Sequence, residues 1–156
     1  MKQLNNYIQG EWIAGTGNGQ LLTDAVTGEP IAQASTQGIN FKSAIEYGRT
    51  IGNPALRSLT FHERGLRLKA LAMHLQKYLP AFYALSYKSG ATKADSWVDI
   101  EGGIGNLFAN ASIRRKFPNE TFCIDGESHN LSKQNTFYGH PLISAQRRSS
   151  HTYQCL

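Results

Sequence analysis

Residues 82–108 read FYALSYKSGATKADSWVDIEGGIGNLF, and this stretch decides which fold the chain can form. Its apolar residues recur every three or four positions, which is the spacing of one face of an α-helix. We predict that one helix begins at Pro80 and stops at Gly90, and that the longest element of the chain covers 93–115. Its expected buried side consists of Trp97, Ile100, Ile104, Leu107, Phe108 and Ala111.

Three glycines, Gly102, Gly103 and Gly105, interrupt this long helix. Each glycine in a helix interior costs up to about 1 kcal/mol relative to alanine. Because a missing side chain lets two backbones touch, we expect a neighbouring helix or strand to approach these residues closely.

Two more helices are expected upstream. Residues 40–52 carry a helical apolar pattern that closes at Gly52, and the stretch 60–79 starts with a capping box made by Thr60 and Glu63. The apolar stripe of the first helix comprises Phe41, Ala44, Ile45 and Ile51, and that of the second comprises Leu66, Ala70, Met73 and Tyr78.

The first 39 residues predict short strands joined by turns. The segment YIQGEW, residues 7–12, reverses at Gly10, and a second turn follows at Thr27 and Gly28. The glycines of GTGNG, residues 15–19, do not predict a phosphate-binding loop. That motif needs a strong strand before it and a helix after it, and the sequence provides neither.

The chain becomes polar and rich in turns after Pro118, with two expected strands over 121–124 and 136–145. Cys123 has no basic neighbour that would lower its pKa, so we interpret it as a small packed residue. The predicted organisation is a hairpin region (1–39), a helical part (40–117), a turn-rich segment (118–148) and a separate tail (149–156).

Composition limits the class of protein. The 156 residues are 40% hydrophobic and carry a formal charge of +5, which suits one domain with weak attraction for polyanions. Two cysteines make neither a disulfide framework nor a zinc site, so we expect a reducing cytoplasm. The sequence shows no signal peptide and no stretch long enough to span a bilayer, so we expect a soluble protein without a membrane partner.

Charged side chains in and after the long helix have structural explanations. Asp95, Asp99 and Glu101 are most simply a solvated helix face, because the histidines show no metal-ligand spacing near them. The basic run 114–116 complements the negative end of the helix dipole, so it needs no nucleic acid. The five histidines are His62, His74, His129, His140 and His151. No serine, cysteine or lysine pairs with a base, and we assign no catalytic, cofactor-binding or metal residue.

Four stretches resemble the N-terminal part of the aldehyde dehydrogenase superfamily: YIQGEW, TGEPIAQA (27–34), PALRSLTFHERGLRLKALAMHL (54–75) and the long run 82–108. The last is similar to the dehydrogenase half of the bifunctional phenylacetic acid degradation enzymes of the PaaZ type. The resemblance covers about residues 3–148. It implies an incomplete α/β fold with N-terminal β-hairpins, about four helices and a short β-ribbon, in which the parallel sheet of the cofactor domain is largely missing.

The resemblance also implies an activity for the whole family. A hydratase half opens the ring of oxepin-CoA, and an NADP- or NAD-dependent half oxidises the resulting aldehyde on a CoA thioester to an acid. The oxidation uses a cysteine thiol, hydride transfer to the cofactor and a glutamate base. The family forms homo-oligomers through a strand that would begin within 137–145. Neither Cys123 nor Cys155 matches the family's nucleophile motif, so the resemblance places no catalytic or cofactor residue here.

The last ten residues, RRSSHTYQCL (147–156), depart from the family. The family continues from this position as Gly-Val-Ala-Val-His-Ile-Asn-Ala. For one permitted choice of codons, reading the tail one base later gives Gly-Val-Ala-Val-Thr-His-Ile-Asn-Ala. We therefore expect a reading-frame shift near Arg147 and a truncated fragment without dehydrogenase activity of its own. Sequencing beyond Leu156 tests this, because dehydrogenase sequence should reappear in another frame.

Two alternatives stay open at this point. The chain could be an independent basic helical module that binds nucleic acid or another polyanion, which salt-sensitive binding to generic DNA or RNA would reveal. It could also be an oligomerisation partner of the full-length enzyme, joined through the strand within 137–145. The fragment interpretation predicts exposed apolar faces and marginal stability, and a sharp cooperative thermal transition from a monomer would contradict it.

Overall fold

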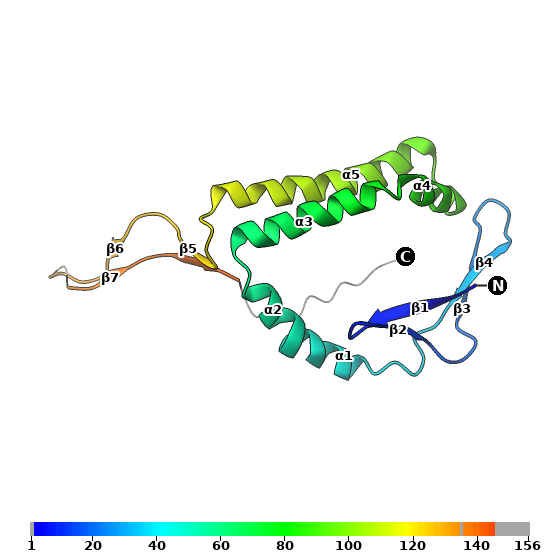
Figure 1. Ribbon diagram of the computed structural model, residues 1–156, viewed down its shortest axis with the longest axis horizontal. Coiled ribbons are helices and arrows are strands. Elements are labelled where there is room, and N and C mark those ends of the chain that lie inside the picture. Colours follow the sequence, from blue (N-terminus) through cyan, green and yellow to red (C-terminus); the bar gives the residue numbers. More distant parts are fainter. Residues whose placement is uncertain (1, 135, 146–156) are drawn as a thin grey trace.

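A computed structural model describes residues 2–134 and 136–145 of the chain. The predictions for the tail 149–156, for Arg147, for His151 and for Cys155 lie outside these residues. The described chain mixes helices and strands, as expected, with one small sheet, four helical stretches and a β-ribbon (Figure 1). The predicted domain boundaries stay predictions.

The N-terminal sheet has the strand order β2-β1-β4-β3. Its strands are β1 (Lys2–Ile8), β2 (Glu11–Ala14), β3 (Gln20–Thr23) and β4 (Pro30–Ala34). Both predicted hairpins are confirmed. In the β1–β2 turn, Gln9 has φ 55° and Gly10 has φ 90°. A two-residue hairpin loop requires such positive φ angles at both positions. The parallel pairing of β1 with β4, which joins the two hairpins, was not predicted.

The first helical stretch is longer than predicted. It comprises α1 (Phe41–Tyr47), a π-helical turn (Gly48–Gly52) and α2 (Asn53–Arg57), so the prediction that it ends at Gly52 is wrong. The amide of Asn53 donates to the carbonyl of Gly48, five residues back. Pro54 has no N–H, and the wider π turn just before it lets the helix continue past this residue.

The remaining helices follow the sequence signals closely. They are α3 (Phe61–Gln76), α4 (Leu79–Lys88) and α5 (Lys93–Ile113), followed by the 3₁₀ turn η2 (Arg114–Lys116). Both halves of the Thr60–Glu63 capping box form, with the Glu63 amide 3.1 Å from Oγ1 of Thr60. Gly90 adopts φ 85° just beyond α4, which confirms it as the helix stop.

Helices α3 and α5 pack along their length through small residues. Gly65 and Ala72 of α3 are buried, as are Ser96, Ile104 and Ala111 of α5. A Cβ atom at Gly65 would lie 2.9 Å from the Ala111 carbonyl oxygen and 2.7 Å from Cδ of Arg114. The missing side chain therefore lets the two helices approach.

The apolar stripe through Leu66, Ala70, Met73 and Tyr78 on and just beyond α3 is exposed, and the buried residues of this helix are the adjacent Gly65 and Ala72. Two predictions for α5 are wrong. Trp97 is 57% exposed, and the neighbouring Ser96 takes its place against α4. A Cβ atom at Gly102, Gly103 or Gly105 would meet nothing within 4 Å in the described chain, so the close approach occurs at Gly65 instead.

The turn-rich segment forms one antiparallel ribbon. Strand β5 (Phe122–Ile124) pairs with β8 (Leu142–Ser144), and β6 (His129–Asn130) pairs with β7 (Tyr138–Gly139). The predicted strand over 136–145 is therefore broken at His140 and Pro141. Proline has no amide to donate to the ladder, and the Pro141 carbonyl instead accepts from the Asp125 amide at 2.9 Å.

The predicted exposed apolar faces are confirmed. The accessible surface of the chain is 12030 Å². A compact protein of 17.3 kDa exposes about 7,800 Å² by the scaling of surface with mass, so this chain exposes about one and a half times that area. Among the described residues, the buried apolar side chains are Ala32, Ala72, Ile104 and Ala111. Such a small core leaves many large apolar side chains exposed, among them Trp12, Val26 and Leu131.

The helix contact at Gly65 generates a prediction with a matched control. Gly65→Ala should lower the free energy of unfolding by about 1–3 kcal/mol, because the new methyl group meets the backbone oxygen of Ala111. Gly102→Ala should raise it by up to about 1 kcal/mol, because it adds helix propensity in open space. Far-UV circular dichroism in increasing urea measures both. Equal or greater stability of the Gly65→Ala chain would contradict the packing described above.

Candidate functional site

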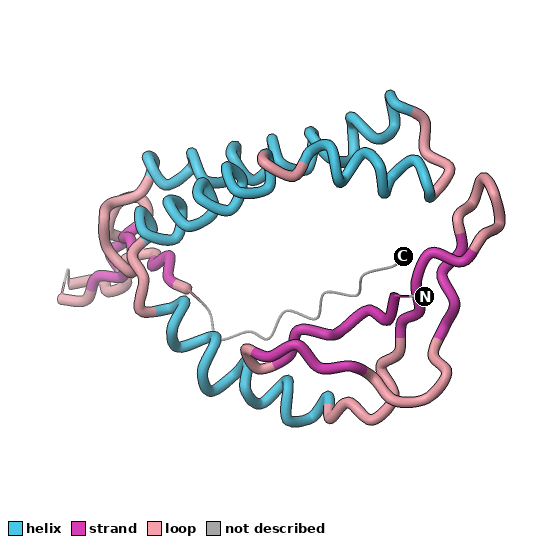
Figure 2. Tube along the Cα trace, turned by 45° about the vertical axis from the view of Figure 1, so that its right-hand side comes forward, coloured by secondary structure: helices cyan, strands magenta, loops and turns pink. Residues whose placement is uncertain are grey.

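A hollow with two walls lies between the N-terminal sheet and the helices. It has a volume of about 880 Å³. The sheet contributes Leu4 and Ile31, α4 contributes Phe82, and α5 contributes Ile100, Gly103 and Leu107. Figure 2 shows the sheet and helices α3–α5 as two layers that meet near the end of α4. The amide of Ala25, in the β3–β4 loop, donates to the Lys88 carbonyl at 2.8 Å and joins the layers there.

The lining of this hollow suits apolar contacts rather than proton transfer. Its charged lining residues within the described chain are Lys2 and Lys88, and no carboxylate, thiol or imidazole joins them. Ser86 also lines it, but its hydroxyl oxygen lies 2.9 Å from that of the buried Ser96, which donates to the Thr92 carbonyl at 2.7 Å. No base is present to activate either serine, so this hollow is a place for apolar groups.

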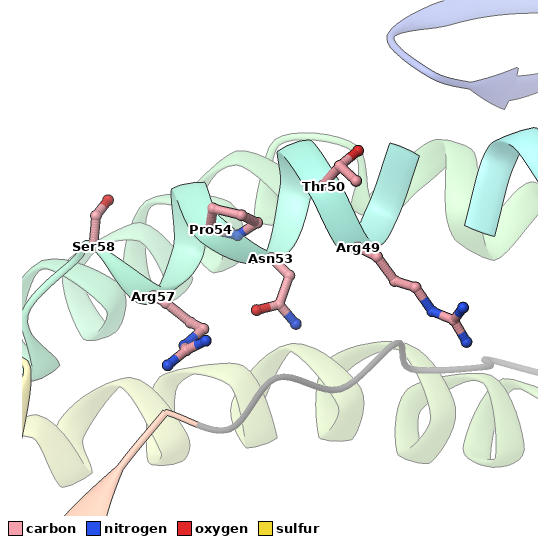
Figure 3. A pocket seen from close by; sticks show the side chains of 6 residues that line it. All are labelled: Arg49, Thr50, Asn53, Pro54, Arg57 and Ser58. Carbon is pink, nitrogen blue, oxygen red and sulfur yellow. The ribbon is translucent and has the colours of Figure 1, made fainter. Parts of the chain in front are cut away.

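A second hollow, of about 610 Å³, is lined by Arg49, Thr50, Asn53, Pro54, Arg57 and Ser58. All six residues come from the single helical stretch that includes the π turn and α2, and Figure 3 shows Arg49, Asn53 and Arg57 projecting on the same side of it. The convex surface of one helix supplies one wall only. The described residues therefore do not build an enclosed anion site there.

The acidic group of the long helix does not converge on one point. Asp95 belongs to the capping box of α5, whose N-cap is Thr92. The Thr92 hydroxyl donates to the Asp95 carboxylate at 2.6 Å, and the Asp95 amide donates to the hydroxyl oxygen of Thr92 at 3.2 Å. Glu101 accepts a hydrogen bond from the Tyr83 hydroxyl at 2.8 Å, and Asp99 is exposed. Within residues 2–134 and 136–145, no cluster of three or more His, Cys, Asp or Glu could hold a metal ion.

The glycine cluster after β2 serves backbone packing. A Cβ atom at Gly15 would overlap the Ser35 carbonyl oxygen at 2.1 Å, and the Thr16 amide donates to the Gln37 carbonyl at 2.9 Å. Gly17, at φ 73°, lies against the Gln37 side chain. The loop is therefore occupied by the segment after β4, and it does not fit the diphosphate of a dinucleotide, which needs free N–H groups.

Three further residues considered in the sequence analysis, Cys123, Arg114 and His62, have structural roles. Cys123 lies in the ribbon, partly covered, with its thiol 3.3 Å from the Ile124 carbonyl oxygen. Arg114 donates to the Ala111 carbonyl at 2.7 Å, so this residue of the basic run serves the C-terminal end of α5. His62 lies 2.9 Å from the Phe117 carbonyl oxygen, so its ring is used in joining α3 to the segment after α5.

The sequence comparisons give a relative that this chain matches over part of that relative's length. No family model matches the chain. A curated protein, the 3,4-dehydroadipyl-CoA semialdehyde dehydrogenase of Aromatoleum evansii, is 36% identical over 142 residues, which is 90% of this chain and 28% of that enzyme. The resemblance to the aldehyde dehydrogenases of the PaaZ type is thereby confirmed. The chain spans about 28% of the length of this relative. In the part of the chain that the structure describes, no helix is long and apolar enough to cross a membrane.

The contact between Tyr83 and Glu101 generates a pH-dependent prediction. The hydrogen bond to Glu101 raises the pKa of Tyr83 to about 12, because ionised Tyr83 would lose this bond and face a carboxylate. An unfolded tyrosine ionises near pH 10, so the contact stabilises the fold below about pH 10 and this contribution is lost as the pH rises to about 12. Absorbance at 295 nm should show one tyrosine that ionises near pH 12.

The Tyr83→Phe variant should lack this last ionisation. In Glu101→Gln the carboxylate charge is gone while an acceptor is kept, so the ionisation of Tyr83 should move down toward pH 10. If the step near pH 12 persists in Tyr83→Phe, another residue is responsible for it.

Proposed function

We propose that this chain is the N-terminal part of an NAD(P)-dependent aldehyde dehydrogenase that oxidises a semialdehyde carried on a CoA thioester. The observation that carries the proposal is the 36% identity with the semialdehyde dehydrogenase of Aromatoleum evansii over 90% of this chain. The name of that enzyme specifies an aldehyde on a CoA-linked acid, so we infer a substrate of the same chemical class.

In this enzyme the chain acts as a scaffold. Its described residues hold no thiol beside a base and no cradle for a dinucleotide diphosphate, and the proposed activity assigns these groups to the rest of the enzyme. When bound, the nicotinamide cofactor accepts the hydride of the aldehyde. The helices and the sheet of this chain support the proposal because many of their large apolar side chains, such as Trp12, Leu85 and Trp97, are exposed.

We also propose an origin for the substrate and a contact for oligomerisation. The substrate would come from the hydrolytic ring opening of oxepin-CoA, and homo-oligomers would form through the strands of the ribbon within 137–145. The ribbon fits an oligomer contact because Phe137, Tyr138 and Leu142 expose at least half of their surface.

A chimeric enzyme tests the proposed function. We replace the matched segment of the Aromatoleum evansii enzyme by the corresponding residues of this chain and measure cofactor reduction at 340 nm with a CoA-linked semialdehyde. We expect activity within about tenfold of the parent, because a scaffold exchange should change the activation free energy by no more than about 1.4 kcal/mol. The 156-residue chain alone should show no activity.

The controls are the unmodified parent and the parent from which the matched segment is deleted. A chimera with the circular dichroism of the parent and no measurable cofactor reduction would refute the proposed function.

A further inference from the structure

The loop between β2 and β3 contains Asn18 followed directly by Gly19. Of all the asparagines in the sequence, Asn18 is the one that precedes a glycine. Glycine has no side chain, so its backbone nitrogen can be approached closely by a neighbouring group. The pair therefore combines a side-chain amide with the least hindered backbone nitrogen that can follow it.

The Asn18 side chain is also free to react. It is exposed, and none of the hydrogen bonds among the described residues involves its amide. Other asparagine side chains are engaged. Oδ1 of Asn40 accepts from the Ser43 amide at 3.0 Å. Oδ1 of Asn119 accepts from the Thr60 hydroxyl at 2.7 Å. These contacts hold the two amides in place, whereas Asn18 has no such contact.

The backbone on each side of this side chain packs tightly against the end of β4. A Cβ atom at Gly15 would lie 2.1 Å from the Ser35 carbonyl oxygen. A Cβ atom at Gly19 would lie 2.3 Å from the Ala34 carbonyl oxygen. Strand β3 begins at the next residue, Gln20, which lies opposite Ala34. An extra backbone atom between the two glycine contacts would therefore displace the start of β3 from β4.

We propose that Asn18 is a deamidation site, which fits the general lability of asparagine. The Gly19 backbone nitrogen attacks Cγ of Asn18 and forms a C–N bond. The side-chain nitrogen leaves as ammonia, together with the proton of the Gly19 N–H. The resulting succinimide ring takes up one water, and either of its C–N bonds breaks. The products are aspartate at position 18, or isoaspartate, in which Cβ has entered the backbone.

The isoaspartate product has a structural consequence. Its longer backbone lies between the contacts of Gly15 and Gly19, so β3 pairs less well with β4 in this form. Both products add a negative charge to a chain whose formal charge is +5. The modification therefore lowers the net charge and loosens one edge of the sheet. This inference does not depend on the proposed function.

The test follows the whole chain in mildly alkaline buffer. Cleavage after glutamate releases residues 12–29, in which Asn18 is the single asparagine, and residues 30–46, in which Asn40 serves as an internal reference. Mass spectrometry measures the conversion of amide to acid in both peptides. We expect conversion of Asn18 to be faster by a factor of about ten or more. An isoaspartate methyltransferase with S-adenosylmethionine should label residues 12–29.

Asn18→Gln is the matched variant, because it keeps the amide but would have to form a larger and slower ring. Its residues 12–29 should not be labelled, and labelling there would overturn the inference. Equal conversion of Asn18 and Asn40 in the wild-type chain would also overturn it. A parallel sample in urea provides a further check: conversion that occurs only in urea would mean that the folded loop protects Asn18.

Hydrogen exchange tests the structural consequence. In the isoaspartate form, the amides of β3 should exchange faster than in the fresh chain, while those of α5 should be unchanged. Unchanged exchange in β3 would refute the effect of the longer backbone on the sheet.

Discussion

The contact of α3 with α5 at Gly65 is the interaction on which the rest of the described structure depends. The two helices are the longest in the described chain, and they supply three of its four buried apolar side chains, Ala72, Ile104 and Ala111. The pair positions α4, because Ser86 of α4 bonds Ser96 of α5. It also positions the ribbon, whose first strand follows Glu120, the acceptor for the Phe61 amide.

The sheet is joined to this helical pair by few contacts. The bond from Ala25 to Lys88 lies at one end of the layers, and the apolar hollow occupies the space between them. A two-layer protein normally gains most of its stability from side chains that fill this space. In the described chain this space stays open and is lined by core-type side chains such as Leu4, Phe82 and Leu107.

The sequence predicted the elements much better than their buried faces. Capping boxes, glycine stops and hairpin turns depend on residues within a few positions of each other, so Thr60, Gly10 and Gly90 could be assigned correctly. The buried face of α5 was wrong at Trp97, because this helix carries apolar or small residues on more than one side and periodicity cannot choose between them. The continuation past Pro54 depended on a π turn, for which no sequence signal was recognised.

Residue spacing along the sequence indicated no catalytic, cofactor-binding or metal site. The apolar hollow could not be predicted from such spacing. Its walls bring together Leu4, Leu22 and Leu107, which are far apart in the sequence and look like ordinary core residues. One signal was present: Gly102, Gly103 and Gly105 cost helix stability, and no close contact among the described residues offsets that cost. We placed the close approach there, whereas in the described chain it occurs at Gly65.

The parallel pairing of β1 with β4 has a consequence for the order in which the chain folds. Lys2 lies opposite Ala32, whereas β1 and β2 are separated by two residues, so the first hairpin closes a far smaller loop than the parallel pair does. During synthesis, β1 leaves the ribosome with one edge that stays unpaired until β4 has emerged. That edge carries Leu4, and its early pairing with another nascent chain would compete with the native sheet.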